Sequence, residues 1–295
     1  MTDPLDLLTQ INLDDLVAAF GWERYPRLAA ALRLTFGGMA RKFAAQMIEF
    51  DAQVGASDLP TASFHTIRRY VRSLRVYGAE HLPASGPVLV LSNHPGMADT
   101  LALFCAIRRA DLRIIALDRP FLQSLPNTSR LLYYISDQPN ERMRAVRQTA
   151  AHLKQGGAVL TFPAGKIEPD ADVYDGAEQA LAGWTDSAGV FVRFAPETRI
   201  VPALVRGVLW EKAVRHPLVY LKRDRFEREK LGAAFQLLAH ILFDLRPVDI
   251  SVQFGAPITA AGVGSLDASA LHAAVIEEMR GLLRAPRGQD VPSIL

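Results

Sequence analysis

The sequence predicts an α/β fold: a largely parallel mixed sheet flanked by helices, with an N-terminal helical segment. Two observations lead to this prediction. Short apolar runs rich in β-branched residues recur between residues 88 and 254, with helix-like segments between most of them. Strands that alternate with helices form βαβ units, which place the strands parallel in one sheet. Before residue 73, apolar residues recur instead at helical spacing.

The predicted strands are the apolar runs at 88–91, 113–117, 158–162, 200–205, 218–221 and 248–254. The predicted helices among them cover 100–109, 142–154 and 227–245. Residues 88–91 read Val-Leu-Val-Leu, without the alternation of a strand that faces water, so we expect this strand to be buried on both faces. We predict two consecutive parts, a helical N-terminal segment over 1–73 and the main domain over 74–295.

The N-terminal segment is predicted to contain a helix that starts at Asn12, with acidic residues in its first turn. Further along, a stripe of apolar residues keeps one helix face apolar: Leu28, Leu32, Met39, Phe43, Met47 and Phe50. We interpret this stripe as a packing face. The alternative is a membrane-facing surface, because Arg33, Arg41 and Lys42 flank the same stripe.

The composition excludes several classes of protein. With 49% hydrophobic and 22% charged residues, the chain is globular and not disordered. A net charge of +2, from 33 basic and 31 acidic residues, argues against a nucleic-acid binder. A single cysteine, Cys105, allows no intramolecular disulfide and fits a reducing compartment; we interpret it as a core residue in preference to an acyl-carrying nucleophile.

The chain contains no uninterrupted apolar run of ~18 residues, which a transmembrane helix requires, and its N-terminus lacks the basic region of a secretory signal. We therefore expect a cytoplasmic protein, either soluble or peripheral on the cytoplasmic face of the membrane.

A histidine and an aspartate five residues apart follow the predicted strand 88–91. His94 begins a Pro-Gly turn, and Asp99 falls in the opening turn of the next predicted helix. In an α/β sheet, the end of a strand is where catalytic side chains collect. The spacing brings the carboxylate to one ring nitrogen, which leaves the other as the proton acceptor. For this pair alone, a loop histidine beside a helix-start acid is the simpler interpretation.

A second predicted strand end carries a tight turn. Residues 161–166 read Thr-Phe-Pro-Ala-Gly-Lys after an apolar run, and Pro163 and Gly165 force the turn. Such a turn leaves backbone N–H groups accessible to an oxyanion or a phosphate. Val201 and Pro202 lie in a further strand of the same predicted sheet.

In this order and spacing the chain resembles the lysophospholipid acyltransferase superfamily, which includes bacterial 1-acylglycerol-3-phosphate and glycerol-3-phosphate acyltransferases. The resemblance covers residues 76–258. The matching residues are Asn93, His94 and Asp99 in the first block, Phe162, Pro163 and Gly165 in the third, and Val201 and Pro202 in the fourth. The resemblance implies that His94 and Asp99 are the catalytic pair and that the other matching residues bind substrate.

The chain departs from the family where an arginine usually binds an acceptor phosphate. Residues 134–138 read Tyr-Ile-Ser-Asp-Gln, and the usual Phe-Pro-Glu-Gly-Thr-Arg reads Phe-Pro-Ala-Gly-Lys-Ile at residues 162–167. Lys166, Arg142 and Arg144 are the remaining candidates for a phosphate contact, although a lysine is a point charge and not a bidentate fork.

The resemblance implies transfer of a fatty acyl group from acyl-CoA or acyl-carrier protein to a lysophospholipid or glycerol-phosphate acceptor, in phospholipid biosynthesis. It also implies a membrane surface as partner, with no cofactor, no metal and no nucleic acid. Two alternatives remain: acylation of an amine or neutral hydroxyl, as in aminolipid synthesis, and a non-catalytic lipid- or acyl-carrier-binding relative. His94 and Asp99 at catalytic spacing argue against the second alternative, because binding alone requires neither residue.

Overall fold

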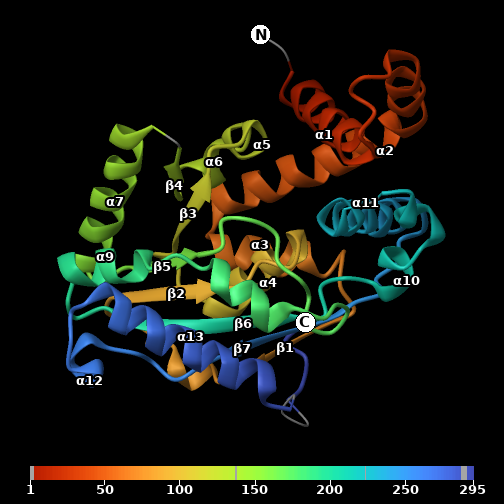
Figure 1. The fold of residues 1–295 in the computed structure, drawn as a ribbon. Coiled ribbons are helices and arrows are strands. Elements are labelled where there is room, and N and C mark those ends of the chain that lie inside the picture. Colours follow the sequence, from red (N-terminus) through yellow and green to blue (C-terminus); the bar gives the residue numbers. More distant parts are fainter. Residues whose placement is uncertain (1–2, 137, 223, 287–290) are drawn as a thin grey trace. The chain divides into compact units, whose positions relative to one another are not determined.

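A computed structural model describes residues 3–136, 138–222, 224–286 and 291–295 (Figure 1). By their contacts the residues form two compact units. The first contains the chain up to residue 72 together with 119–130 and 209–248, and the second contains 73–118, 131–208 and 249–295. The contacts thus divide the chain near the predicted boundary at residue 73, but two later segments group with the N-terminal helices.

The first unit is helical. Its elements are α1 (Pro4–Phe20), α2 (Pro26–Ala56), α3 (Leu59–Ile67), α5 (Pro120–Gln123), α6 (Pro126–Ser129), α10 (Glu211–Val214), the 3-10 helix η3 (Pro217–Leu221) and α11 (Arg225–Phe243). The predicted helix start at Asn12 is wrong, because α1 begins eight residues earlier, at Pro4. The Asp3 carboxylate accepts from the amide of Leu5 at 3.1 Å, and Pro4 occupies the first helical position, where no amide hydrogen is needed.

The apolar stripe of α2 is mostly a packing face. Leu32, Phe43, Met47 and Phe50 are buried, and Phe43 and Met47 pack in one cluster with Leu8 of α1. The flanking cations are engaged within the same unit. Arg33 pairs with Asp14, Arg41 pairs with Asp6, and Lys42 donates to the carbonyl of Ile241. The stripe itself therefore offers little surface to a membrane.

The predicted strand at 218–221 is wrong, because this segment is the 3-10 helix η3. Its apolar composition fits a strand, but Pro217 has no amide hydrogen for a sheet ladder and fixes the first turn. The His216 ring accepts from the amide of Leu218 at 3.3 Å and caps the turn. The predicted helix at 227–245 is confirmed as α11, within two residues at each end.

The second unit is built on a seven-stranded sheet in the order β1-β7-β6-β2-β5-β3-β4. Its strands are β1 (Ser73–Tyr77), β2 (Val88–Ser92), β3 (Arg113–Leu117), β4 (Leu132–Ile135), β5 (Ala158–Thr161), β6 (Arg199–Arg206) and β7 (Asp249–Phe254). All neighbouring strands are parallel except β6 and β7. The predicted largely parallel mixed sheet is confirmed. β1 and β4 were not predicted; most of their residues are only half-buried, with burial confined to Ser73 and Leu74 in β1 and to Leu132 in β4.

Helices and helical turns lie between the strands of this unit and after its last strand (Figure 1). They are η1 (Ala79–His81), α4 (Met97–Ile107), α7 (Pro139–Lys154), α8 (Ala177–Ala180), η2 (Leu181–Gly183), α9 (Ser187–Phe194), α12 (Ala260–Val263) and α13 (Ala268–Arg284). One core cluster joins side chains of β2, β5 and β6 to α7, α9 and α13, among them Leu89, Val159 and Val275. β2 is buried along its whole length, as predicted for a central strand.

None of the helices in the described part of the chain combines the length and the apolar character that crossing a membrane requires.

Candidate active site

The loops after β2 and β5 meet because these strands are neighbours in the sheet. The two strands are parallel, and Leu91 is aligned with Thr161, the last residue of β5. Parallel strands end at the same edge of a sheet. At that edge, the amide of Glu168 donates to the carbonyl of His94 at 2.8 Å, so the two loops are hydrogen-bonded to each other.

His94 and Asp99 form a hydrogen-bonded pair. The Nδ1 atom of His94 lies 2.9 Å from Oδ2 of Asp99. With Nδ1 carrying the hydrogen towards the carboxylate, Nε2 is the nitrogen that can accept a proton from a substrate. The His94 side chain is 26% exposed and that of Asp99 is fully buried, so the imidazole is open to solvent and the carboxylate is not.

Asp99 is held in place by the start of helix α4. Its Oδ2 atom also accepts from the amide of Gly96 at 2.9 Å, and its Oδ1 atom accepts from the hydroxyl of Thr100 at 2.9 Å. An acid in the third position of a helix closes the first turn in this way. The carboxylate therefore has three donors around it and a single orientation towards His94.

The charges around His94 raise its pKa above the ordinary value. Burial acts in the opposite direction and is the largest single influence, because it disfavours the charged ring. The charge and hydrogen bond of Asp99, together with the charge of Glu168, more than compensate for it. The site is therefore arranged to stabilise an imidazolium, the form that a general base takes after accepting a proton.

Phe162 lies against the imidazole. The two ring centroids are 4.5 Å apart, with 30° between the ring planes. Next to it, Pro163 is buried and its carbonyl accepts from the amide of Thr185 at 3.2 Å. Of these two sequence-predicted site residues, Phe162 contacts His94 directly, and Pro163 fastens its loop to the segment before α9.

Glu168 was not singled out by the sequence, because no motif marks it. Its Oε2 atom accepts from the amide of His94 at 3.2 Å, and its Oε1 atom accepts from Nε1 of Trp184 at 2.7 Å. Burial raises the pKa of Glu168 to about 7, although the hydrogen bonds from Trp184 and from His94 act to lower it. Its only signal in the sequence is its place, three residues beyond the Gly165 turn.

Asn93 anchors the His94 loop to the sheet. Its side-chain amide donates to the carbonyl of Val205 at 2.9 Å and its oxygen accepts from the amide of Val205 at 2.8 Å. Val201 and Pro202 are buried inside β6, where the carbonyl of Pro202 accepts from the amide of Gly255. Asn93 therefore ties the His94 loop to β6, and Val201 and Pro202 lie within that strand.

Gly165 has the left-handed backbone that the turn requires, with φ at 61°. Its amide donates to the carbonyl of Phe162 at 3.0 Å, so it closes the turn and is already engaged. Lys166 follows Gly165 and is exposed, four residues after Phe162, whose ring packs on His94.

Arg142 and Arg144 are exposed in the first turns of α7, which follows β4. β5 and β3 separate β4 from β2, which corresponds to about 14 Å between the strands. Among the three sequence-predicted cations, Lys166 is therefore the one that follows a strand next to β2. In the stretch 134–138, Asp137 lies outside the described residues.

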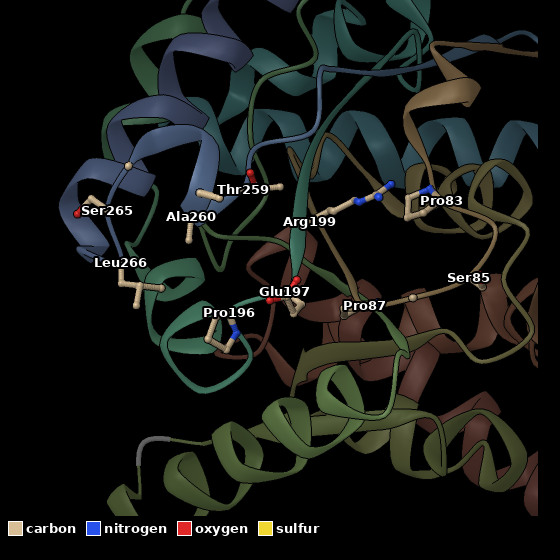
Figure 2. A pocket seen from close by; sticks show the side chains of 13 residues that line it. Pro83, Ser85, Pro87, Pro196, Glu197, Arg199, Thr259, Ala260, Ser265 and Leu266 are labelled. Carbon is tan, nitrogen blue, oxygen red and sulfur yellow. The ribbon is translucent and has the colours of Figure 1, made fainter.

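A pocket of about 750 Å³ opens at the amino-terminal ends of β2 and β6, at the other end of these strands from His94 (Figure 2). Pro87 and Arg199 stand at these strand starts, and Glu197 and Leu266 line the same pocket. It is lined by no residue of the His94 or Phe162 loops, so it is separate from the His94–Asp99 pair. Within the described residues, no group of three or more His, Cys, Asp or Glu side chains is placed to hold a metal ion.

Comparisons with known proteins find a family match and a similar structure. Residues 73–206, from β1 to the end of β6, match the family model described as Acyltransferase. The crystal structure of PlsC, the 1-acyl-sn-glycerophosphate (LPA) acyltransferase from Thermotoga maritima, is similar at 16% identity with a TM-score of 0.45, over 96% of this chain and 95% of that chain. A comparison with curated protein sequences finds no match.

Proposed function

We propose that this protein, whose residues 73–206 match the acyltransferase family, transfers a fatty acyl group from a thioester to a phosphate-bearing lipid acceptor. The donor is acyl-CoA or acyl-carrier protein, and the acceptor is a lysophospholipid or glycerol phosphate. The observation that carries the proposal is the 2.9 Å contact between Nδ1 of His94 and Oδ2 of Asp99 at the edge where two strand-end loops meet.

In the proposed reaction, Nε2 of His94 takes the proton of the acceptor hydroxyl, and the hydroxyl oxygen attacks the thioester carbonyl carbon. Asp99 stabilises the imidazolium that forms. As the tetrahedral intermediate collapses, the carbon–sulfur bond breaks and the imidazolium returns its proton to the leaving sulfur. The products are the acylated lipid and a free thiol. We assign stabilisation of the oxyanion to backbone amides near Gly165, other than the Gly165 amide itself, which closes the turn.

The two vacant arginine positions favour a second candidate, acylation of an amine or of a neutral hydroxyl. A phosphate-bearing acceptor normally requires the forked donors of arginine, whereas these two acceptors require no cation. Lys166 is the residue on which the two candidates differ, because it is exposed and directly follows Gly165 in the turn after β5.

The function is tested by thiol release from palmitoyl-CoA and from palmitoylated carrier protein, with lysophosphatidate, glycerol 3-phosphate, an amine-bearing acceptor and a monoacylglycerol. We expect release that depends on an acceptor and is fastest with lysophosphatidate. Fastest release with the amine-bearing acceptor or the monoacylglycerol would support the second candidate. If no donor releases thiol with any of these acceptors, the proposal is wrong.

In the same assay, Lys166→Ala is expected to raise the KM for lysophosphatidate roughly ten- to a hundredfold, because a charge-assisted hydrogen bond to the phosphate is lost. The KM for a neutral acceptor should change little. Lys154→Ala is the matched control, an exposed lysine at the far end of α7. Unaltered kinetics with lysophosphatidate in Lys166→Ala would remove this lysine from the acceptor site.

We also propose that the protein associates peripherally with anionic membranes, since a lipid acceptor resides there. Because the α2 stripe is packed, we assign the contact to η3, where Leu218, Tyr220 and Leu221 are exposed and the guanidinium of Arg228 lies 5.3 Å from the centroid of the Tyr220 ring. Exposed apolar side chains beside cations suit the interface of an anionic bilayer.

In liposome flotation, the protein is expected to rise with vesicles that contain anionic lipid and to rise less in high salt. Leu221→Glu should reduce flotation, because its 78% exposed side chain would enter the interface as a charge. Leu34→Glu is the matched control, since Leu34 is 88% exposed on α2 of the same unit. Equal flotation of the Leu221→Glu variant and the wild type would exclude η3 as the contact.

A further inference from the structure

Glu168 makes three hydrogen bonds in the candidate site, and two of them join its loop to the His94 loop. Its amide donates to the carbonyl of His94, its Oε2 atom accepts from the amide of His94, and its Oε1 atom accepts from the indole of Trp184. The residue is 3% exposed and therefore has no solvent to replace these partners. Both carboxylate oxygens serve as acceptors, which only the ionised form does without conflict.

We propose that Glu168 is a positioning residue for the proposed acyl transfer, which fixes the backbone of His94 from one side while Asp99 fixes its ring from the other. Asp99 acts within the same loop and the adjoining helix turn, whereas Glu168 reaches His94 from the loop after β5. Without Glu168, the amide of His94 loses this acceptor, and the imidazole orientation would depend on Asp99 and Phe162.

The charge of Glu168 adds a second effect. The ionisable groups that face it are His94 and Asp99: the charge of His94 lowers the pKa of Glu168 and that of Asp99 raises it. In return, the Glu168 charge contributes to the raised pKa of His94. The two hydrogen bonds that the Glu168 carboxylate accepts, from the amide of His94 and the indole of Trp184, form what we call the Glu168 clamp. Burial raises the pKa of Glu168 to about 7, so the carboxylate is ionised and the clamp is complete above that pH, and the clamp is lost as the pH falls through it.

Glu168→Gln is expected to lower kcat roughly ten- to a hundredfold, with a much smaller change in the KM of the acceptor. A glutamine has one acceptor oxygen, so its NH₂ group must face either the amide of His94 or the indole of Trp184, and the displaced loop misplaces the base. In the pH profile of kcat/KM, the fall in rate on the acid side should also move to lower pH, because His94 loses a neighbouring negative charge and its pKa is lowered. A purely structural residue would lower the rate at every pH without moving that fall in rate.

Trp184→Phe is a second variant that keeps the carboxylate. It removes the indole donor, which acts to lower the pKa of Glu168, so Glu168 stays protonated up to higher pH. We expect a loss of activity at about pH 7 that is largely regained at about pH 9. Glu197→Gln is the matched control, an exposed glutamate that lines the pocket at the amino-terminal ends of β2 and β6 (Figure 2), and it should behave as wild type.

The titration of the His94 ring, followed by NMR and identified by the signal missing in His94→Ala, reads the same effect without turnover. We expect the His94 pKa to be lower in Glu168→Gln than in the wild type. If the wild type transfers no acyl group, the proposed function fails while this titration still tests the clamp. If neither the fall in rate on the acid side nor the His94 titration moves in Glu168→Gln, and Trp184→Phe loses activity equally at all pH values, Glu168 is not a positioning residue.

Discussion

Replacing His94 with alanine is expected to lower kcat/KM for acyl transfer by at least roughly 10³-fold, to the limit of a thiol-release assay. The change removes Nε2, the atom that takes the acceptor proton in the proposed reaction, and a positioned general base contributes on the order of 10²–10⁴ in rate. The imidazole also carries the charge that Asp99 stabilises, so its loss removes both contributions together.

The fold should survive this change. The His94 side chain is partly exposed and its main packing partner is the ring of Phe162. We expect the thermal unfolding midpoint of His94→Ala to stay close to that of the wild type. His65→Ala is the control, because His65 is an exposed histidine of α3 in the other unit and should leave acyl transfer unchanged. Near wild-type turnover in folded His94→Ala would falsify the proposed mechanism.

Asp99→Asn is expected to lower kcat by about 10²–10⁴-fold while leaving the loop geometry intact. In this structure the substitution can remove the charge of Asp99 without removing its hydrogen bonds. The introduced asparagine can place its oxygen where Oδ2 of Asp99 accepts from Gly96 and His94, and turn its NH₂ group towards the Thr100 hydroxyl, which also accepts hydrogen bonds. Shape and hydrogen bonds are kept, and the negative charge alone is lost.

The same variant makes a prediction about pH. Asp99 is the leading cause that raises the pKa of His94, so the fall of kcat/KM on the acid side in Asp99→Asn should lie at lower pH than in the wild type. Pre-steady-state thiol release across the pH range measures both the maximal rate and the pH at which the rate falls on the acid side. Asp99→Ala is the comparison, because it also leaves donors of His94 and Gly96 without an acceptor and should destabilise the fold. Retention of kcat within about twofold in Asp99→Asn would show that imidazolium stabilisation is not needed.

How far the sequence determines the site depends on how local each contact is. His94 and Asp99 are five residues apart, within one loop and the first turn of α4, so their pairing follows from a turn and a helix start. Glu168 lies 74 residues from His94, and Val205 lies 112 residues from Asn93. Those contacts require β2 to have β5 on one side and β6 on the other, an order that no residue pattern specifies.

The same distinction holds for the fold. The apolar run from Val88 to Leu91 correctly predicts a buried strand, because a strand covered on both faces has apolar residues at every position. The run at 218–221 has a similar composition but forms a 3-10 helix, since Pro217 and the His216 cap decide its local structure. β1 and β4 were missed because their half-buried residues give a weaker apolar signal.

The sequence by itself therefore determined much of the alternation of strands and helices and the pairing of His94 with Asp99 at a strand end, because each depends on residues that are close in the chain. The tertiary structure alone decided that Asn93 anchors to β6, that Arg142 follows a distant edge strand, and that Glu168 holds His94. The physical reason is that strand order and loop contacts arise from packing over the whole sheet. Burial then gave Glu168 its raised pKa, which its position in the chain does not reveal.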